Sequence, residues 1–364
     1  MNHLSSQSPN RRPAAALCRA KSLVAALMVA GACAGALAGT VDEDWQAVVA
    51  LDAGPGGQSP STVEAAGMLV VNHLAKQEKA LRAFLAAHPE DAHVFEAQLR
   101  LARLLQIRAD FEGSEKLRAE SKRLLDGLEK TATAEQRPEL EFAKLARMMR
   151  TLKRTDPAQR EELLTAARRF QSDYPTDRRV AALLTEVATL FDTQPKVKEV
   201  LLDDAQALAK EPDLKTRIAD DLKRVHLVGE TVPLSFTSVQ GQEVSIESLA
   251  GRPVFVIFFA QSSPPAMAAL GKLQQEVAQL PQGSIRVVGV DLDIKRETVM
   301  DLLKSHSITW PTAWDGKGWT GPLVRSLGIN ALPTVWLLDV HGRLRSLNAL
   351  ENAANQARLL IHEK

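Results

Sequence analysis

The chain has 364 residues, a length that corresponds to about two globular domains. Its 45 Lys and Arg residues nearly balance its 44 Asp and Glu residues, for a formal net charge of +1. This balance excludes the strong basic excess of most nucleic-acid-binding proteins, so we expect no nucleic-acid partner. Hydrophobic residues make up 45% of the chain, an ordinary share for a protein with packed cores.

Residues 1–38 have the pattern of an export signal. Arg11, Arg12, Arg19 and Lys21 precede the apolar run SLVAALMVAGACAGALA, which ends in an Ala-x-Ala sequence at residues 36–38. A basic start, a short apolar run and small residues before a cleavage site are typical of a secretory signal peptide. The run is rich in Ala and Gly and short for a membrane span, although an uncleaved N-terminal anchor remains an alternative.

Both cysteines of the chain, Cys18 and Cys33, lie in this segment. Cleavage after Ala38 would leave no thiol and would remove four basic and no acidic residues, so that the formal net charge falls from +1 to −3. Cys33 follows a weak lipobox, Ala-Gly-Ala, which makes a lipoprotein the other possibility. We predict an exported protein of the periplasm or cell envelope, in contact with a membrane only through a lipidated Cys33 or an uncleaved signal.

Residues 39–226 carry helical periodicity and almost no strand pattern. A capping-box sequence at Ser61–Glu64 precedes apolar residues at three- and four-residue spacings. Pro157, Pro195 and Pro212 each stand where a helix would begin. These signals predict roughly eight helices, stacked as antiparallel hairpins. Clusters of arginine between residues 147 and 179 alternate with Asp and Glu, so we interpret them as solvated helix faces.

One turn of this region occurs twice. The sequence from Phe84 through Pro89 and Asp91 matches the sequence from Phe170 through Pro175 and Asp177, 86 residues later. In each copy we expect the proline to stop one helix and the aspartate to cap the next. The turn resembles that of tetratricopeptide (TPR) repeats, although the 34-residue period is missing. A TPR-like helical array is predicted, with a plain helical bundle as the alternative.

Residues 227–364 change to strands and turns. Two apolar runs, PVFVIFFA and SIRVVGVDLD, have the character of buried strands. Each is followed by an amphipathic helix, PPAMAALGKLQQEVAQL and RETVMDLLKSH. The segments TVWLLD and RLRSL then form a closing hairpin before a last helix, NAANQARLL. The order predicts a mixed α/β sheet.

These motifs, in this order, resemble the thioredoxin-like superfamily, in its TlpA/ResA-like (redoxin) branch of exported reductases. The resemblance implies a Cys-x-x-Cys turn at the end of the first long strand, where a helix N-terminus lowers the pKa of the attacking thiol. Here the two cysteine positions fall on Ser263 and Ala266, with Pro264 and Pro265 between them. Because a serine hydroxyl cannot form a stable mixed disulfide and alanine cannot resolve one, we expect no thiol–disulfide catalysis and no cofactor.

Ser263 has two possible roles. It could be a nucleophile in another chemistry, which would require a base such as His306 or His341 within hydrogen-bond reach. It could instead be the N-cap of the following helix, with Pro264 at the first helical position. Nothing in the spacing brings either histidine to Ser263, so the sequence favours the cap.

The recognition side of the family's site persists in the sequence. Leu332, Pro333 and Thr334 match the family's cis-proline, beside which an extended polypeptide pairs with the backbone. Trp310, Trp314 and Trp319 gather nearby in what we expect to be a loop. Such tryptophans either anchor a partner or plug the loop onto its own domain. We predict these six residues as a binding surface, with a purely structural role as the alternative.

Two carboxylates follow the second buried strand. Asp291 and Asp293 could suggest a cation, but two acids without further ligands are a weak pattern. We expect an exposed strand end there and no metal.

The sequence thus predicts an exported thioredoxin-fold protein without redox cysteines that binds or scaffolds envelope polypeptides. One alternative is a non-catalytic component of a TlpA-like redox system that positions a substrate. The other is a helical scaffold that carries a relic thioredoxin domain.

Overall fold

The computed structural model describes residues 40–56 and 62–363. The predicted signal peptide, with Cys18 and Cys33, lies outside these residues. Within the described ranges, no helix combines the length and the apolar character that crossing a membrane requires.

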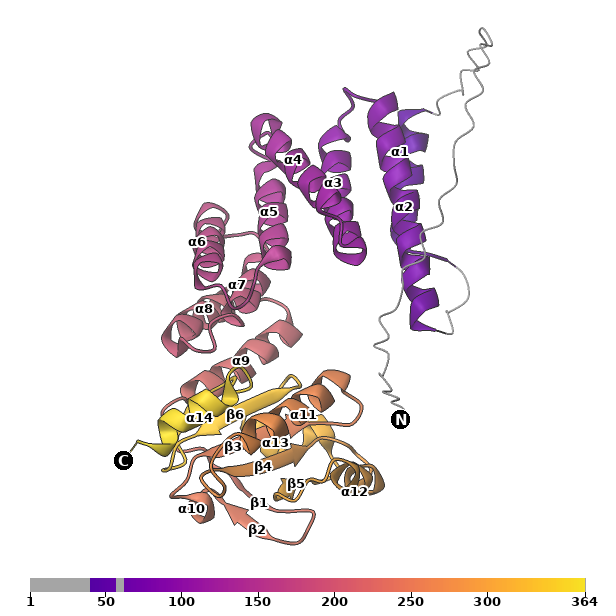
Figure 1. Cartoon of the computed structure of the whole chain (residues 1–364). Helices are drawn as coiled ribbons and strands as arrows, with labels where there is room; N and C mark the ends of the chain where they lie inside the picture. Colours follow the sequence, from indigo (N-terminus) through magenta and orange to yellow (C-terminus); the bar gives the residue numbers. More distant parts are fainter. Residues whose placement is uncertain (1–39, 57–61, 364) are drawn as a thin grey trace, which may run out of the picture.

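The described N-terminal part is entirely helical, and consecutive helices pack against each other (Figure 1). Nine α-helices and one 3₁₀ turn, η1 (Leu51–Ala53), precede the first strand of the described chain, so the expectation of roughly eight helices is close. Proline opens α6, α8 and α9 as predicted. Instead of the expected capping box, α2 has a simple N-cap: Thr62 accepts from the Ala65 amide at 3.1 Å, and alanine has no side chain that could bond back. The helices are α1 (Val41–Ala50), α2 (Val63–Ala87), α3 (Val94–Glu112), α4 (Glu115–Thr131), α5 (Arg137–Thr151), α6 (Pro157–Asp173), α7 (Val180–Ala188), α8 (Pro195–Leu208) and α9 (Pro212–His226).

The repeated turn has the same backbone in both copies. After α2 the His88 amide donates to the Phe84 carbonyl at 2.9 Å, and after α6 the Tyr174 amide donates to the Phe170 carbonyl at 2.9 Å. The expectation that the aspartates are N-caps is wrong, because His93 and Arg179 occupy the N-cap positions. Each aspartate instead accepts the amide two residues later at 2.8 Å, Asp177 from the Arg179 amide, because the chain makes an extra turn before the next helix begins.

The C-terminal part is built on a five-stranded mixed sheet in the order β5-β4-β3-β6-β7. Strands β3, β4 and β5 are parallel, and β6 and β7 are antiparallel to their neighbours. The elements are β3 (Val254–Phe259), α11 (Pro264–Ala278), β4 (Arg286–Asp291), α12 (Arg296–Ser305), β5 (Thr312–Ala313), α13 (Pro322–Ser326), β6 (Thr334–Leu338), β7 (Leu344–Ser346) and α14 (Ala353–Ile361). A small hairpin, β1 (Ser235–Thr237) with β2 (Glu243–Ser245), and the short α10 (Ile246–Leu249) precede them. The predicted mixed α/β thioredoxin-like fold is confirmed.

The two faces of the sheet belong to different cores. Phe255, Ile257 and Phe259 of β3 pack with α11, α12 and α14 on one face. Val256 and Phe258, which point to the other face, join a core that also contains side chains of α6 to α9. Figure 1 shows α9 lying beside the sheet. The helical region and the sheet are therefore joined by one continuous hydrophobic core, which runs across residue 226.

Candidate functional site

One edge of the sheet gathers most of the residues singled out in the sequence. The parallel strands β3 and β4 end together, with Phe259 opposite Asp291. Strand β6 runs the other way and begins at this edge, with Thr334 opposite Phe258. The turn that contains Ser263, the carboxylates that follow β4 and the proline before β6 therefore lie at one edge, because carboxyl ends of parallel strands meet there.

Ser263 is the N-cap of α11. Its Oγ accepts a hydrogen bond from the Ala266 amide at 3.4 Å, and its carbonyl accepts from the Met267 amide at 3.0 Å. Pro264 and Pro265 fill the first helical positions, where a missing N–H costs no hydrogen bond. Ala266 is fully buried in the core under the sheet. The serine and the alanine thus have complete structural roles at the two positions that resemble the family's cysteines.

Neither candidate base lies at this edge. His341 is in the turn between β6 and β7, at the opposite end of β6 from Thr334. His306 follows α12, and its carbonyl accepts a hydrogen bond from Gln274 at 2.8 Å. Gln274 lies eleven residues along α11 from Ser263, or roughly 16 Å at the helical rise. The geometry therefore gives Ser263 no histidine partner, in line with the cap.

Asp291 and Asp293 are buried, so the expectation of an exposed strand end is wrong. Asp291 is 4% exposed and Asp293 is 9% exposed. The Asp293 carboxylate accepts from the Gln261 amide at 2.7 Å, which ties it to the Ser263 turn, and its own amide donates to Asp291 Oδ1 at 2.7 Å. Burial, reinforced by repulsion from Asp293, raises the pKa of Asp291 to about 7. In the described part of the chain no third acid, histidine or cysteine joins them as a metal-ligand group.

The three clustered tryptophans have different environments. Trp314 is half-buried and donates its indole N–H to the Asp293 carbonyl at 2.6 Å, so it holds the segment after β4. Trp310 packs against the core under α11 and α12. Trp319 is 49% exposed, in the 3₁₀ turn η2 (Gly318–Thr320). The segment is not wholly a loop, because Thr312 and Ala313 form β5 between the first two tryptophans.

The proline before β6 has the predicted backbone, since the Leu332–Pro333 peptide bond is cis. The loop that leads to it is held against α9. Asn330 accepts from Arg224 Nη1 at 2.7 Å and donates to Asp221 Oδ1 at 2.8 Å, while Arg224 also donates to the Gly328 carbonyl and pairs with Asp221. The helical region therefore positions the cis-proline loop directly.

A cleft of about 510 Å³ opens where this loop faces the helices, and we call it the cis-proline cleft. One wall comes from the sheet side and is uncharged. The other comes from α8, α9 and the turns after α5 and α7, and it carries four cationic and two acidic side chains. The sheet-side wall consists of Asn330, Ala331, Pro333, Thr334, Val335, Leu347, Asn348 and Leu350, and the helical wall of Arg154, Thr189, Asp192, Lys198, Arg217, Asp221 and Arg224. No spacing pattern in the sequence indicated the helical wall, because its members are up to 70 residues apart and have the character of solvated charges.

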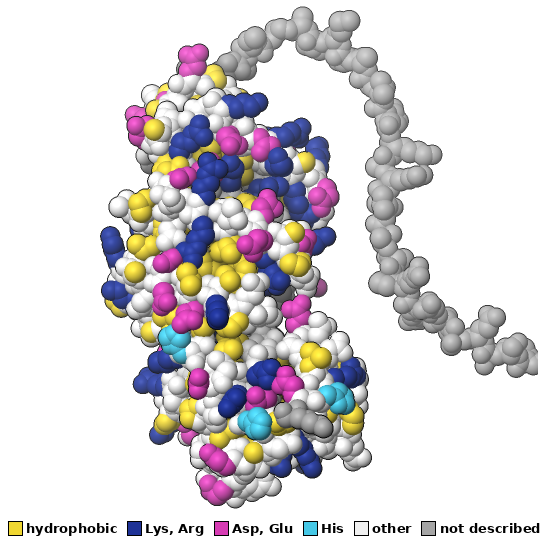
Figure 2. Space-filling view, turned by 90° about the vertical axis from the view of Figure 1, so that its left-hand side faces the viewer, with side chains coloured by type: hydrophobic (Ala, Val, Ile, Leu, Met, Phe, Trp, Pro, Cys, Tyr) yellow, Lys and Arg dark blue, Asp and Glu magenta, His cyan; other side chains and the backbone are white. Residues whose placement is uncertain are grey.

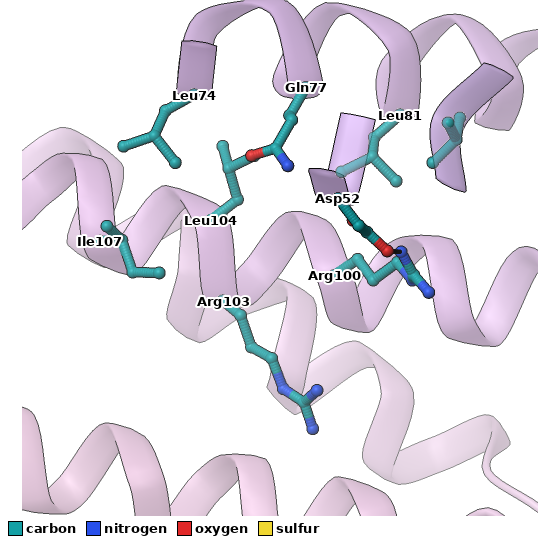
Figure 3. Close-up of a pocket in the computed structure, with 9 residues that line it drawn as sticks. Asp52, Leu74, Gln77, Leu81, Arg100, Arg103, Leu104 and Ile107 are labelled. Carbon is teal, nitrogen blue, oxygen red and sulfur yellow. Dashed lines mark hydrogen bonds and ion pairs between the residues drawn. The ribbon is translucent and has the colours of Figure 1, made fainter. Parts of the chain in front are cut away.

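Among the described residues, a smaller cavity of about 180 Å³ lies between α1, α2 and α3 (Figure 3). Leu74, Leu81 and Leu104 line its apolar side, and Arg100 pairs with Asp52 at 2.6 Å beside them. Arg103 points away from the leucines and pairs with Glu139 of α5. Both arginines that line this cavity are therefore paired with carboxylates of the helical region, which makes the cavity a weaker candidate binding site than the cis-proline cleft.

Comparison with known proteins identifies the C-terminal part. Residues 228–347 match the model of the AhpC/TSA family. Thiol-disulfide oxidoreductase ResA of Bacillus thuringiensis is 22% identical over 118 residues, which cover 32% of this chain and 66% of that protein. Sporulation thiol-disulfide oxidoreductase A of Bacillus subtilis is 26% identical over 110 residues, covering 29% and 64%. The matches thus span slightly less than two thirds of these relatives.

Solved structures of similar proteins cover the same region. A thiol:disulfide interchange protein of Chlorobium tepidum is 20% identical with a TM-score of 0.31, covering 36% of this chain and 94% of that one. A secreted thiol-disulfide isomerase of Corynebacterium glutamicum is 18% identical with a TM-score of 0.32, covering 36% and 86%. From the family match, the curated relatives and its own sheet topology, the C-terminal part of the chain is a thioredoxin-fold redoxin domain of the AhpC/TSA type, similar to the ResA-like thiol-disulfide oxidoreductases.

Proposed function

We propose that this protein is an exported, thioredoxin-fold binding protein for polypeptides that performs no thiol–disulfide turnover. The observation that carries the proposal is Ser263, which caps α11 at the position that resembles the family's attacking cysteine. Export is inferred from the signal pattern of residues 1–38, and the division into a helical domain (39–226) and a thioredoxin-like domain (227–364) from the change of sequence pattern.

The chemistry supports the absence of turnover. Reduction of a substrate disulfide requires a thiolate that forms a mixed disulfide and a second thiol that releases it. No cysteine follows Cys33 in the sequence, so the described chain can supply neither group. A serine alkoxide would form only an unstable S–O bond, and the buried methyl group of Ala266 has no leaving or attacking role.

Polypeptide binding is supported by the cis-proline and the cleft beside it, which lie at the same edge of the sheet as Ser263. The cis Leu332–Pro333 bond borders a cleft of about 510 Å³, large enough for a few residues of an extended chain. Backbone groups beside such a proline can pair with an added strand, while the cleft walls would select its side chains. Of the six predicted binding residues, Pro333 and Thr334 line this cleft, whereas Leu332 packs against the hydrophobic core and the three tryptophans belong to a separate segment.

A disulfide-reductase assay tests the proposal. Residues 39–364 should reduce insulin no faster than buffer with the same reductant. Installing both thiols, as Ser263→Cys with Ala266→Cys, should produce turnover because the helix N-terminus that lowers a thiol pKa is already in place. The matched control Ser263→Thr with Ala266→Ser keeps a capping hydroxyl but adds no thiol, so it should remain inactive. Turnover by the unmodified chain would refute the proposal.

The nature of the partner separates the proposal from its two alternatives. Crosslinked capture from the envelope should use the full chain, because a cut at residue 226 would expose the shared core. A partner that bears its own Cys-x-x-Cys would favour a positioning subunit of a redox system. A partner that Trp314 and Pro333 substitutions do not release would favour a helical scaffold with a relic redoxin domain.

A further inference from the structure

The charges of the cis-proline cleft indicate what kind of polypeptide it accepts. Four cations and two acids line it, an excess of positive charge on a chain that is nearly neutral. Figure 2 shows Lys and Arg side chains gathered over the helical region, with Asp and Glu among them, so the pairing of each cation decides which charges remain available.

Both acids of the cleft are already engaged. Asp221 pairs with Arg224 and also accepts from the Asn330 amide. Asp192 pairs with Lys198, whose side chain is only 5% exposed. Both carboxylates of the lining are therefore neutralised by a cation of the same wall, and Asp221 also holds the cis-proline loop through Asn330.

Two exposed arginines of the lining remain. Arg154 is exposed and donates only to Thr189, to its carbonyl at 3.3 Å and its hydroxyl at 3.4 Å; no carboxylate of the described residues lies within ion-pair distance of it. Arg217 pairs with Glu186 at 2.8 Å, but both side chains are more than 40% exposed, so this pair is screened by water and can exchange partners at little cost.

The opposite wall offers uncharged polar groups. Asn348 is exposed, and Ala331, Pro333 and Thr334 of the cis-proline loop line the same wall. An extended ligand would therefore meet backbone and amide groups on one side and guanidinium groups on the other. Guanidinium groups bind carboxylates in a bidentate manner, which gives both geometry and charge selection.

We propose that the cis-proline cleft binds an acidic polypeptide segment, with its main chain along residues 331–334 and its Asp or Glu side chains on Arg154 and Arg217. This inference rests on the proposed polypeptide-binding function and adds a substrate class to it. The helical region would thus supply the charge selection, and the redoxin domain would supply the surface that holds the main chain.

The test measures peptide binding to residues 39–364 by fluorescence anisotropy. One labelled probe is a short extended peptide rich in Glu, and its matched counterpart carries Gln at the same positions. We expect the Glu peptide to bind about tenfold or more tightly than the Gln peptide at low salt, and the difference to shrink as salt screens the arginines. Equal affinities for the two peptides, or no binding of the Glu peptide, would overturn the inference.

Variants locate the effect. Arg154→Gln with Arg217→Gln should remove the preference for Glu, with about a tenfold loss for the acidic peptide and little change for the neutral one. The control Arg123→Gln removes an exposed arginine of α4 that lines none of the described cavities, and it should leave both affinities within about twofold. An unchanged preference in the double variant would overturn the assignment to this cleft.

Two further readouts separate this inference from the proposed function. Inorganic phosphate should compete only weakly; competition as strong as that of unlabelled Glu peptide would identify a small-anion site and overturn the polypeptide assignment. Binding of both peptides with equal affinity would leave the proposed function standing while the acidic selection fails. Reductase turnover by the unmodified chain would refute the proposed function itself, whatever the peptides do.

Discussion

Asp291 is the residue whose environment departs most from what its sequence position suggests. It ends a strand, yet it is buried, and its Oδ2 has no hydrogen-bond partner in the described structure. Burial favours the neutral form of a carboxyl group. Asp291 accepts the Asp293 amide, and the Asp293 carboxylate accepts the Gln261 amide, so the two acids together hold the turn that contains Ser263.

This environment predicts a pH-dependent stability. Because burial raises the pKa of Asp291 to about 7, the folded protein keeps a proton that the unfolded chain releases near pH 4. The free energy of unfolding should therefore fall as pH rises from about 4 to 7, by up to about 1.4 kcal/mol per pH unit from this group, and level off above that range. Asp291→Asn keeps the acceptor for the Asp293 amide but cannot titrate, so its stability relative to the natural protein should increase across this window.

Urea unfolding at several pH values between 4 and 8 measures this difference. The control is Asp315→Asn, an exposed carboxylate that accepts the Lys317 amide at 2.8 Å. A difference between Asp291→Asn and the natural protein that stays constant over the whole range would show that Asp291 is charged in the folded state.

At the scale of elements, α9 and the cis-proline loop act as one unit. The loop approaches α9 so closely that a Cβ on Gly328 would lie 2.5 Å from the Asp220 carbonyl oxygen. Gly328 also has φ +68°, a conformation that L-residues adopt at a cost. The close approach places Arg224 within reach of Asn330 and thereby fixes one wall of the cleft.

Gly328→Ala should separate these two elements. Gly229→Ala is the matched control, because Gly229 has φ +88° but open space around the position of its Cβ. Both variants carry the backbone cost, and Gly328→Ala should lose about 1–3 kcal/mol more from the forced shift of the loop or helix. Urea unfolding gives the two values. Equal losses would mean that the contact with α9 yields freely and does not position the loop.

At the scale of the whole molecule, one hydrophobic core contains residues from both sides of residue 226, where the sequence pattern changes from helices to strands. Phe258 and Trp336 of the sheet share a cluster with Leu184 and Leu201 of α7 and α8, whereas α1 to α3 have a cluster of their own. Segments that share a core tend to open together, because opening one exposes the apolar surface of the other.

Hydrogen exchange should reveal this coupling. Amides in α7 and α8 should exchange with about the same opening free energy as those in β3, and amides in α2 should exchange at a lower one. Native-state exchange measured by mass spectrometry at increasing urea gives the value for each segment. The shared core would lose its support if α7 and α8 exchanged together with α2 while β3 remained protected.

Much of the fold could be predicted from the sequence because its signals are local. The apolar run of β3, the proline at the start of α6 and the repeated turn after Phe84 and Phe170 each depend on a few neighbouring residues. The two-residue strand β5 and the five-residue helix α13 were not predicted, because such short elements carry no detectable periodicity and form only against the rest of the sheet.

In the candidate site, too, features that depend on residue identity could be predicted, and features that depend on distant contacts could not. The absence of redox chemistry follows from the sequence alone: serine and alanine stand at the two positions that resemble the family's cysteines, and no thiol follows Cys33, so residue identity limits the chemistry whatever the fold. Three features become visible only in the folded chain: Asp291 is buried, α9 holds the cis-proline loop, and Arg154 and Arg217 line one cleft with Pro333. Both the contact of α9 with the loop and the cleft join residues more than a hundred positions apart, and neither spacing nor periodicity records which distant surfaces a common core will bring together.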